Sequence, residues 1–98
     1  MKSIVTLNDI ERMKDALRAS LPDIKSSHRV EALARGLGWT TNASMRAALA
    51  AAPAETSPDE GTFLDYLRLH SFDAPGGTLL RAFAQAGLRR VMDLAPDL

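Results

Sequence analysis

The sequence contains no cysteine, one tryptophan, one tyrosine and three phenylalanines among its 98 residues. The absence of cysteine excludes disulfides and thiolate metal sites. Because aromatic rings are few, Ala, Leu and Met must fill most of the core, and this composition favours helix over strand. No apolar run approaches the roughly 18 residues that span a bilayer. The N-terminal segment also gains charge too early for a signal peptide. We therefore expect a soluble, cytoplasmic protein with no membrane partner.

The formal net charge is zero, because twelve Lys and Arg residues balance twelve Asp and Glu residues. The two halves nevertheless differ in sign. Residues 1–50 carry eight basic and five acidic side chains, whereas residues 51–98 carry four basic and seven acidic ones. This asymmetry is only a weak indication of a charged partner, and an ordinary solvated surface explains it more simply.

Apolar residues recur at three- and four-residue steps along most of the chain, which predicts an all-α fold. With the capping residues and prolines, they predict a compact bundle of about five short helices near residues 6–21, 26–37, 40–52, 57–70 and 78–95. We expect one helical domain, 1–98, in which a two-helix part (57–98) packs on a three-helix part (1–53). Residues 53–57 are expected to be a linker, and Ile4-Val5 at most a short extended arm.

Local signals predict several helix ends and buried faces. Thr6 and Asp9 approximate a capping box at the start of the first helix. Ser57 as N-cap, followed by Pro58 and Glu60, predicts the start of the fourth. Gly38 suits the left-handed conformation that follows a helix end. The expected buried faces of the last three helices are Met45, Ala48, Leu49 and Ala52; Phe63, Tyr66, Leu67 and His70; and Leu80, Phe83, Ala84, Leu88, Val91, Met92 and Ala95.

The hairpin at residues 26–52 resembles a repressor-type helix-turn-helix, on the segment LARGLGWTTNASMRAAL. In that pattern a small residue such as Ala34 lets two helices cross closely, and a glycine such as Gly38 forms the turn. Asn42 and Arg46 carry groups that bind adenine and guanine. The turn is one residue longer than usual, and Ser44 stands where a buried Val or Ile is expected. A DNA-binding transcription regulator is therefore the alternative interpretation.

A second resemblance covers residues 13–49. Its signature is Ser27, His28, the run Glu31-Ala32-Leu33-Ala34-Arg35, Leu37-Gly38 and Trp39. This segment is similar to a small helical segment that accompanies glyoxalase-like domains in some bacterial proteins, and to short proteins of plasmids and phages. The strand-rich, metal-binding part of the glyoxalase-like fold has no counterpart in this sequence. The resemblance therefore implies a small accessory protein of a mobile element and transfers no catalytic residue.

The sequence shows no arrangement typical of catalysis. Ser71 adjoins His70, so a Ser-His-Asp triad with Asp65 is not formed. Two histidines without companions do not make a metal site, and Gly76-Gly77 lacks the spacing and lysine of a phosphate-binding loop. We expect no enzymatic activity, no cofactor and no metal.

The sequence thus predicts a small non-catalytic protein that binds a protein partner through a helical surface. One form of this hypothesis is a phage or mobile-element inhibitor of the anti-CRISPR kind. Nucleic acid is the alternative partner, and a homodimer is left open. Trp and Arg commonly anchor protein interfaces. The candidate partner-binding residues are Lys25, His28, Arg29, Arg35, Trp39, Thr41, Asn42 and Arg46.

Overall fold

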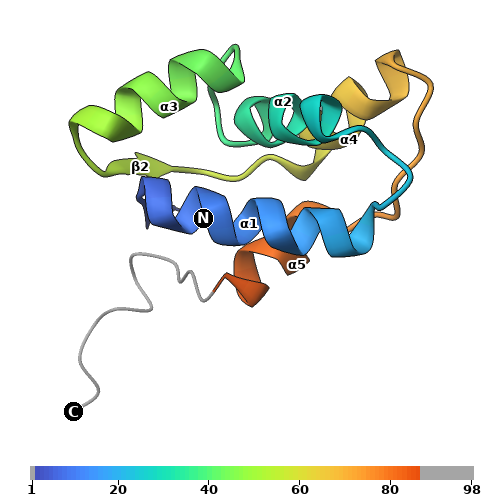
Figure 1. Ribbon diagram of the computed structural model, residues 1–98, viewed down its shortest axis with the longest axis horizontal. Helices are drawn as coiled ribbons and strands as arrows, with labels where there is room; N and C mark the ends of the chain where they lie inside the picture. The colour runs from blue at the N-terminus through green and yellow to red at the C-terminus, as the bar shows by residue number, and fades with distance from the viewer. Residues whose placement is uncertain (1, 87–98) are drawn as a thin grey trace.

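The computed structural model describes residues 2–86, which form five α-helices and one small two-stranded sheet (Figure 1). This confirms the predicted all-α bundle. Within these residues, no helix is both long enough and apolar enough to cross a membrane. The elements, in chain order, are β1 (Ser3–Val5), α1 (Leu7–Ser20), α2 (Ser26–Gly36), α3 (Asn42–Ala51), β2 (Ala54–Thr56), α4 (Glu60–Leu69) and α5 (Thr78–Gln85).

The helices share one core. α4 packs against α2, α5 packs against α1, and α3 contacts both α1 and α2. Figure 1 shows α4 behind α2 and α5 below α1, so the helices of the second half lie against those of the first. Every helix contributes fully or nearly fully buried side chains, among them Ile10, Met13, Leu17, Leu33, Met45, Leu49, Phe63, Leu67, Leu79 and Phe83.

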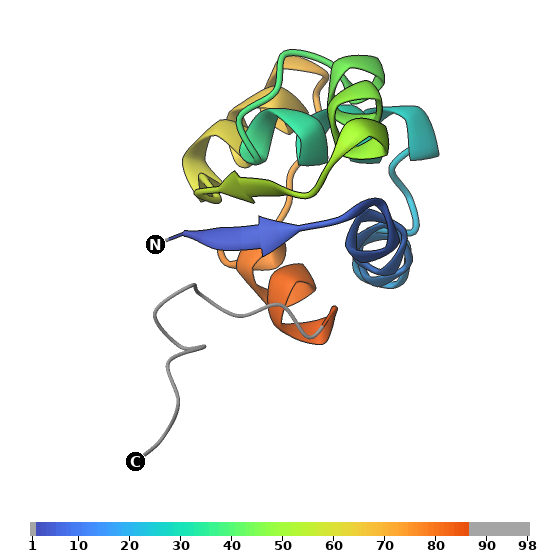
Figure 2. The same ribbon diagram turned by 90° about the vertical axis from the view of Figure 1, so that its left-hand side faces the viewer.

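The sheet was not expected from the sequence. β1 and β2 pair antiparallel with Val5 opposite Ala54 and Ser3 opposite Thr56, and Figure 2 shows the two strands side by side. The prediction that residues 53–57 form a linker is therefore wrong. Three-residue strands are too short for alternation to be visible, and their partners are about fifty positions apart in the sequence.

Two helices start with reciprocal capping boxes. In α1, the Thr6 hydroxyl accepts from Asp9 N at 3.2 Å and the Asp9 carboxylate accepts from Thr6 N at 2.9 Å, as predicted. In α3, the hydroxyls of Thr41 and Ser44 accept from each other's backbone N–H groups at 3.0 and 3.2 Å. Ser44 therefore caps the helix, which explains why this position is not a buried Val or Ile.

The start of α4 differs from the prediction. Asp59, not Ser57, is the N-cap, and its carboxylate accepts from Thr62 N at 3.0 Å. This backbone hydrogen bond lowers the pKa of Asp59. Glu60 instead reaches the start of α5, where its carboxylate accepts from Leu79 N at 3.2 Å and from Leu80 N at 3.1 Å. α5 needs these acceptors because its own N-cap, Gly77, has no side chain.

Several predicted core positions are exposed. Ala48 and Ala52 of the third helical segment, His70 at the end of α4, and Leu80 and Ala84 of α5 all lie at the surface, while Tyr66 is half-buried. The buried stripe of each of these helices is therefore narrower than predicted or rotated about the helix axis, since only part of each apolar face meets a neighbour. The predicted positions Leu88, Val91, Met92 and Ala95 lie outside the described residues.

Gly36 is the point at which three helices come closest. A Cβ atom at this position would lie 2.9 Å from Leu79 Cδ2 and 3.0 Å from Phe63 Cβ. The carbonyl of Gly36 also accepts from Asp59 N at 2.7 Å. The glycine thus lets α4 and α5 approach the end of α2, whereas Gly38, at φ 104°, forms the predicted left-handed turn.

We predict that Gly36→Ala lowers the free energy of unfolding by about 1–2 kcal/mol, since overpacking exceeds the gain in helix propensity. Gly61→Ala is the matched control, because a Cβ there meets only the Asp59 carboxylate at an ordinary 3.4 Å. It should raise stability by about 0.5 kcal/mol. Chemical denaturation measures both, and a Gly36→Ala protein as stable as the parent would contradict the close approach.

Candidate interaction surface

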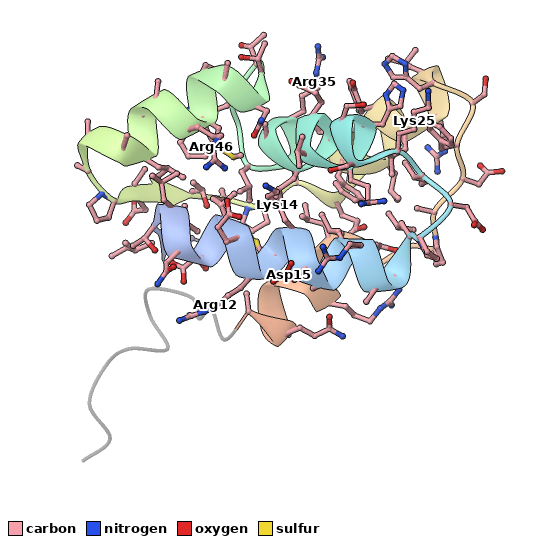
Figure 3. The ribbon with its side chains drawn as sticks, viewed as in Figure 1. Arg12, Lys14, Asp15, Lys25, Arg35 and Arg46 are labelled. Atoms are coloured by element: carbon pink, nitrogen blue, oxygen red, sulfur yellow. The ribbon has the colours of Figure 1, made fainter. Side chains whose placement is uncertain are left out.

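The predicted partner-binding residues do not form one continuous surface. His28 and Arg35 lie on α2 beside α4, Thr41 and Asn42 form the start of α3, and Arg46 pairs with α1. Figure 3 shows Arg35 projecting from α2 away from α1, whereas Arg46 lies toward the seam between α3 and α1. The predicted residues must therefore be considered group by group.

The most distinctive group is a cluster of rings between α2 and α4. The His28 ring lies 4.5 Å from that of His70, 5.2 Å from Phe72 and 6.3 Å from Tyr66, measured between ring centroids. Tyr66 and His70 are 4.6 Å apart. The Arg35 guanidinium lies 5.1 Å from the centre of the Tyr66 ring, within the range of a cation–π contact. We call these five residues the α2–α4 surface.

Helical spacing and one turn produce this surface. His28 and Arg35 are seven residues apart, hence on the same face of α2, and Tyr66 and His70 are four apart. Ser71 adopts a left-handed conformation at φ 64°. As a result, Phe72 N donates to Leu67 O at 2.9 Å and the chain folds back over the end of α4. This turn places the Phe72 ring against His28.

The electrostatics of the surface are positive. None of its five residues is acidic, and neither Arg35 nor nearby Lys25 forms an ion pair with another described residue. Of the carboxylates close by in sequence, Asp65 pairs with Arg68 and Glu31 accepts from Asn42 N, whereas Asp73, next to Phe72, forms no ion pair with a described residue. Nδ1 of His28 is buried, and no described group bonds to it. Leu69, next to His70, is 79% exposed.

Arg29 is a correction to the predicted surface. Its side chain is buried, and its guanidinium donates to the carbonyl of Leu21, at 3.2 Å, and to that of Ile24. These carbonyls lie at the end of α1 and in the loop before α2, where a positive charge is also favoured by the helix dipole. Arg29 therefore joins α1 to α2 and is not available to a partner.

Trp39, Thr41 and Asn42 also serve the fold. Trp39 is half-buried against the core, and its backbone N–H donates to Ala34 O at 2.9 Å across the turn after α2. Thr41 caps α3, as described above. Asn42 N donates to Glu31 at 2.9 Å, while its side-chain oxygen is buried. These residues hold the turn between α2 and α3, while Thr41 stays exposed and Trp39 partly exposed.

Arg46 is committed to α1. Its guanidinium donates to Glu11 at 2.9 Å, and Lys14 lies 3.6 Å from the same carboxylate. The Arg46 hydrogen bond is the main reason that the pKa of Glu11 is lowered. A polar cleft of about 190 Å³ lies beside this ion pair, between α1 and α2, and Asp15 in its lining is paired with Arg18. The two acidic side chains that line the cleft, Glu11 and Asp15, are thus already paired with basic groups.

No group of three or more His, Asp or Glu within residues 2–86 is placed to hold a metal ion.

Sequence reasoning missed Tyr66, His70 and Phe72 as members of a surface. The four-residue spacing of Tyr66 and His70 was interpreted as part of a buried face. Their exposure depends on how α4 is rotated against α2, which a single helix does not reveal. The sequence holds one signal for this surface. Tyr66, His70 and Phe72 place three rings within seven positions of a chain that has few aromatic residues.

We predict that Arg29→Met lowers the free energy of unfolding by about 2–4 kcal/mol, since two carbonyls lose a charged donor. Arg12→Met serves as the control, because the Arg12 side chain is 60% exposed in a 3.5 Å pair with Asp9. It should change stability by at most about 0.5 kcal/mol. Thermal or urea unfolding of both variants tests this, and equal effects would contradict a structural role for Arg29.

A second prediction concerns Arg46 and pH. Because the pKa of Glu11 is lowered, its ion pair with Arg46 stabilises the fold at pH values above the ordinary glutamate pKa. This stability is lost as the pH falls through the lowered pKa of Glu11. Arg46→Gln should raise the pKa of Glu11 toward its ordinary value. Carbon-detected NMR titration of the Glu11 carboxyl measures this, with Arg68→Gln as the control. An unchanged Glu11 pKa would exclude the pair in solution.

Comparison of the chain with protein-family models, with curated proteins and with solved structures found no match. The resemblance to the segment that accompanies glyoxalase-like domains therefore stays a prediction.

Proposed function

We propose that this protein is a non-catalytic binding module that contacts a protein partner through the α2–α4 surface. The observation that carries the proposal is the cluster of four rings and the Arg35 guanidinium on that surface. Arg35 and nearby Lys25 form no ion pair in the described part of the chain. Tyr and Arg are among the side chains that supply most of the energy of protein interfaces.

The surface is also held in place before any partner binds. Each ring contacts at least one other ring, and Arg35 is held over Tyr66. Side chains that are already packed lose little rotamer freedom on association, so less of the interaction energy is spent on ordering them. The exposed Leu69 side chain adds an apolar contact at the edge. These properties support a binding role for this face over the others.

The helix-turn-helix alternative has weaker support. If α3 entered a groove of DNA, its outward positions would be Ala43, Ser44, Ala47, Ala48, Ala50 and Ala51. Alanine offers no group that donates to or accepts from a base edge. Arg46, the expected guanine contact, is hydrogen-bonded to Glu11. The more specific hypothesis of a phage or mobile-element inhibitor of the anti-CRISPR kind stays a prediction, as does a homodimer.

We predict that a partner is captured by the parent protein and lost with the double variant Arg35→Ala, Tyr66→Ala. Affinity purification from the native host with quantitative mass spectrometry measures the enrichment, which should fall at least tenfold. The control is the double variant Arg12→Ala, Lys14→Ala. It removes two cations from α1, one more than the test variant removes, but leaves the α2–α4 surface intact.

Circular dichroism must first show that both double variants are folded. A partner that is retained by the Arg35, Tyr66 variant would exclude this surface. Retardation of duplex DNA at low salt, abolished by Asn42→Ala, would instead favour the transcription-regulator alternative.

A further inference from the structure

We infer that the α2–α4 surface takes an acidic segment of the partner protein. The inference rests on the proposed function, since it names the chemistry that the same surface would recognise. It follows from the arrangement of cations, histidines and aromatic rings on that face.

The first argument is the distribution of positive charge. Lys25 precedes His28 by one helical turn, and Arg35 follows it by two. The other described basic side chains have partners: Arg29 bonds to backbone carbonyls, Arg81 to Gly76 and Thr78. Six more pair with carboxylates, namely Lys2, Arg12, Lys14, Arg18, Arg46 and Arg68. The positive charge that remains without a partner among residues 2–86 is therefore concentrated on the α2–α4 side.

The second argument is shape. The Arg35 guanidinium carbon lies over the Tyr66 ring, 5.1 Å from its centre. A guanidinium in this position can still use its N–H edge to bind a carboxylate with two parallel hydrogen bonds. Tyr66, Phe72 and the exposed Leu69 offer apolar contact beside it. The surface therefore fits a peptide with both acidic and apolar side chains. Nucleic acid would require more cations than this neutral chain provides.

The third argument is the histidine pair. His28 and His70 lie 4.5 Å apart at the centre of the surface. Imidazole N–H groups donate hydrogen bonds to carboxylates. The pair thus adds hydrogen-bond donors to the cations of the same face.

The test uses the full chain and a fluorescein-labelled decapeptide of eight Glu and two Leu residues. We expect saturable binding by anisotropy, with NMR shifts at Arg35, Tyr66 and His70. Arg35→Ala should weaken binding at least fivefold. His70→Gln should weaken binding by a smaller factor, because it removes one exposed imidazole of the surface. Arg12→Ala is the charge-matched control and should bind as the parent does.

Two results would overturn the inference. They are equal binding of a decapeptide with Gln in place of Glu, and tighter binding of an oligothymidine of the same length. If the peptide fails to bind while partner capture still depends on Arg35 and Tyr66, the acidic-segment inference fails and the proposed function stands. Loss of that dependence, by contrast, removes the proposed function itself.

Discussion

The close approach of α4 to α2 at Gly36 is the constraint on which the rest of the structure depends. The missing side chain lets Phe63 and Leu79 reach the backbone of α2, and the 2.7 Å hydrogen bond from Asp59 N fixes the start of α4 against the end of α2. This contact sets both the distance and the rotation of α4. The rotation in turn places Tyr66 and His70 beside His28 and Arg35. A glycine at the end of α2 is thus what brings the two halves of the candidate interaction surface together.

The parts of the fold that the sequence predicts are those governed by near neighbours. The Thr6–Asp9 capping box and the left-handed Gly38 both depend on residues within a few positions of one another. Contacts between distant residues were missed. Glu60 was assigned to the cap of its own helix but serves α5, and Arg29 was assigned to the surface but bonds to the end of α1. The same limit applies to the candidate interaction surface, whose two halves come from α2 and α4.

The helix-turn-helix resemblance concerns local geometry, and the polar residues that carry it are also used by the fold. Residues 26–52 do form two helices joined by a glycine turn. The polar residues at the start of α3, however, are used to build the turn: Thr41 and Ser44 cap each other, and Asn42 is tied to Glu31. What remains on the outside of α3 is mostly alanine. The proposed binding face therefore lies on the opposite side of α2, toward α4.

The capping of α5 by Glu60 has a consequence for how the chain folds. An eight-residue helix with a glycine N-cap has little intrinsic stability, because nucleation costs more than so few hydrogen bonds return. The amides of Leu79 and Leu80 in its first turn are satisfied by Glu60 of α4, and its buried face packs against α1, near the other end of the described chain. Order in α5 is thus conditional on the two helices that it contacts. This coupling makes the bundle a cooperative unit, in which early and late segments of the sequence gain or lose their structure together.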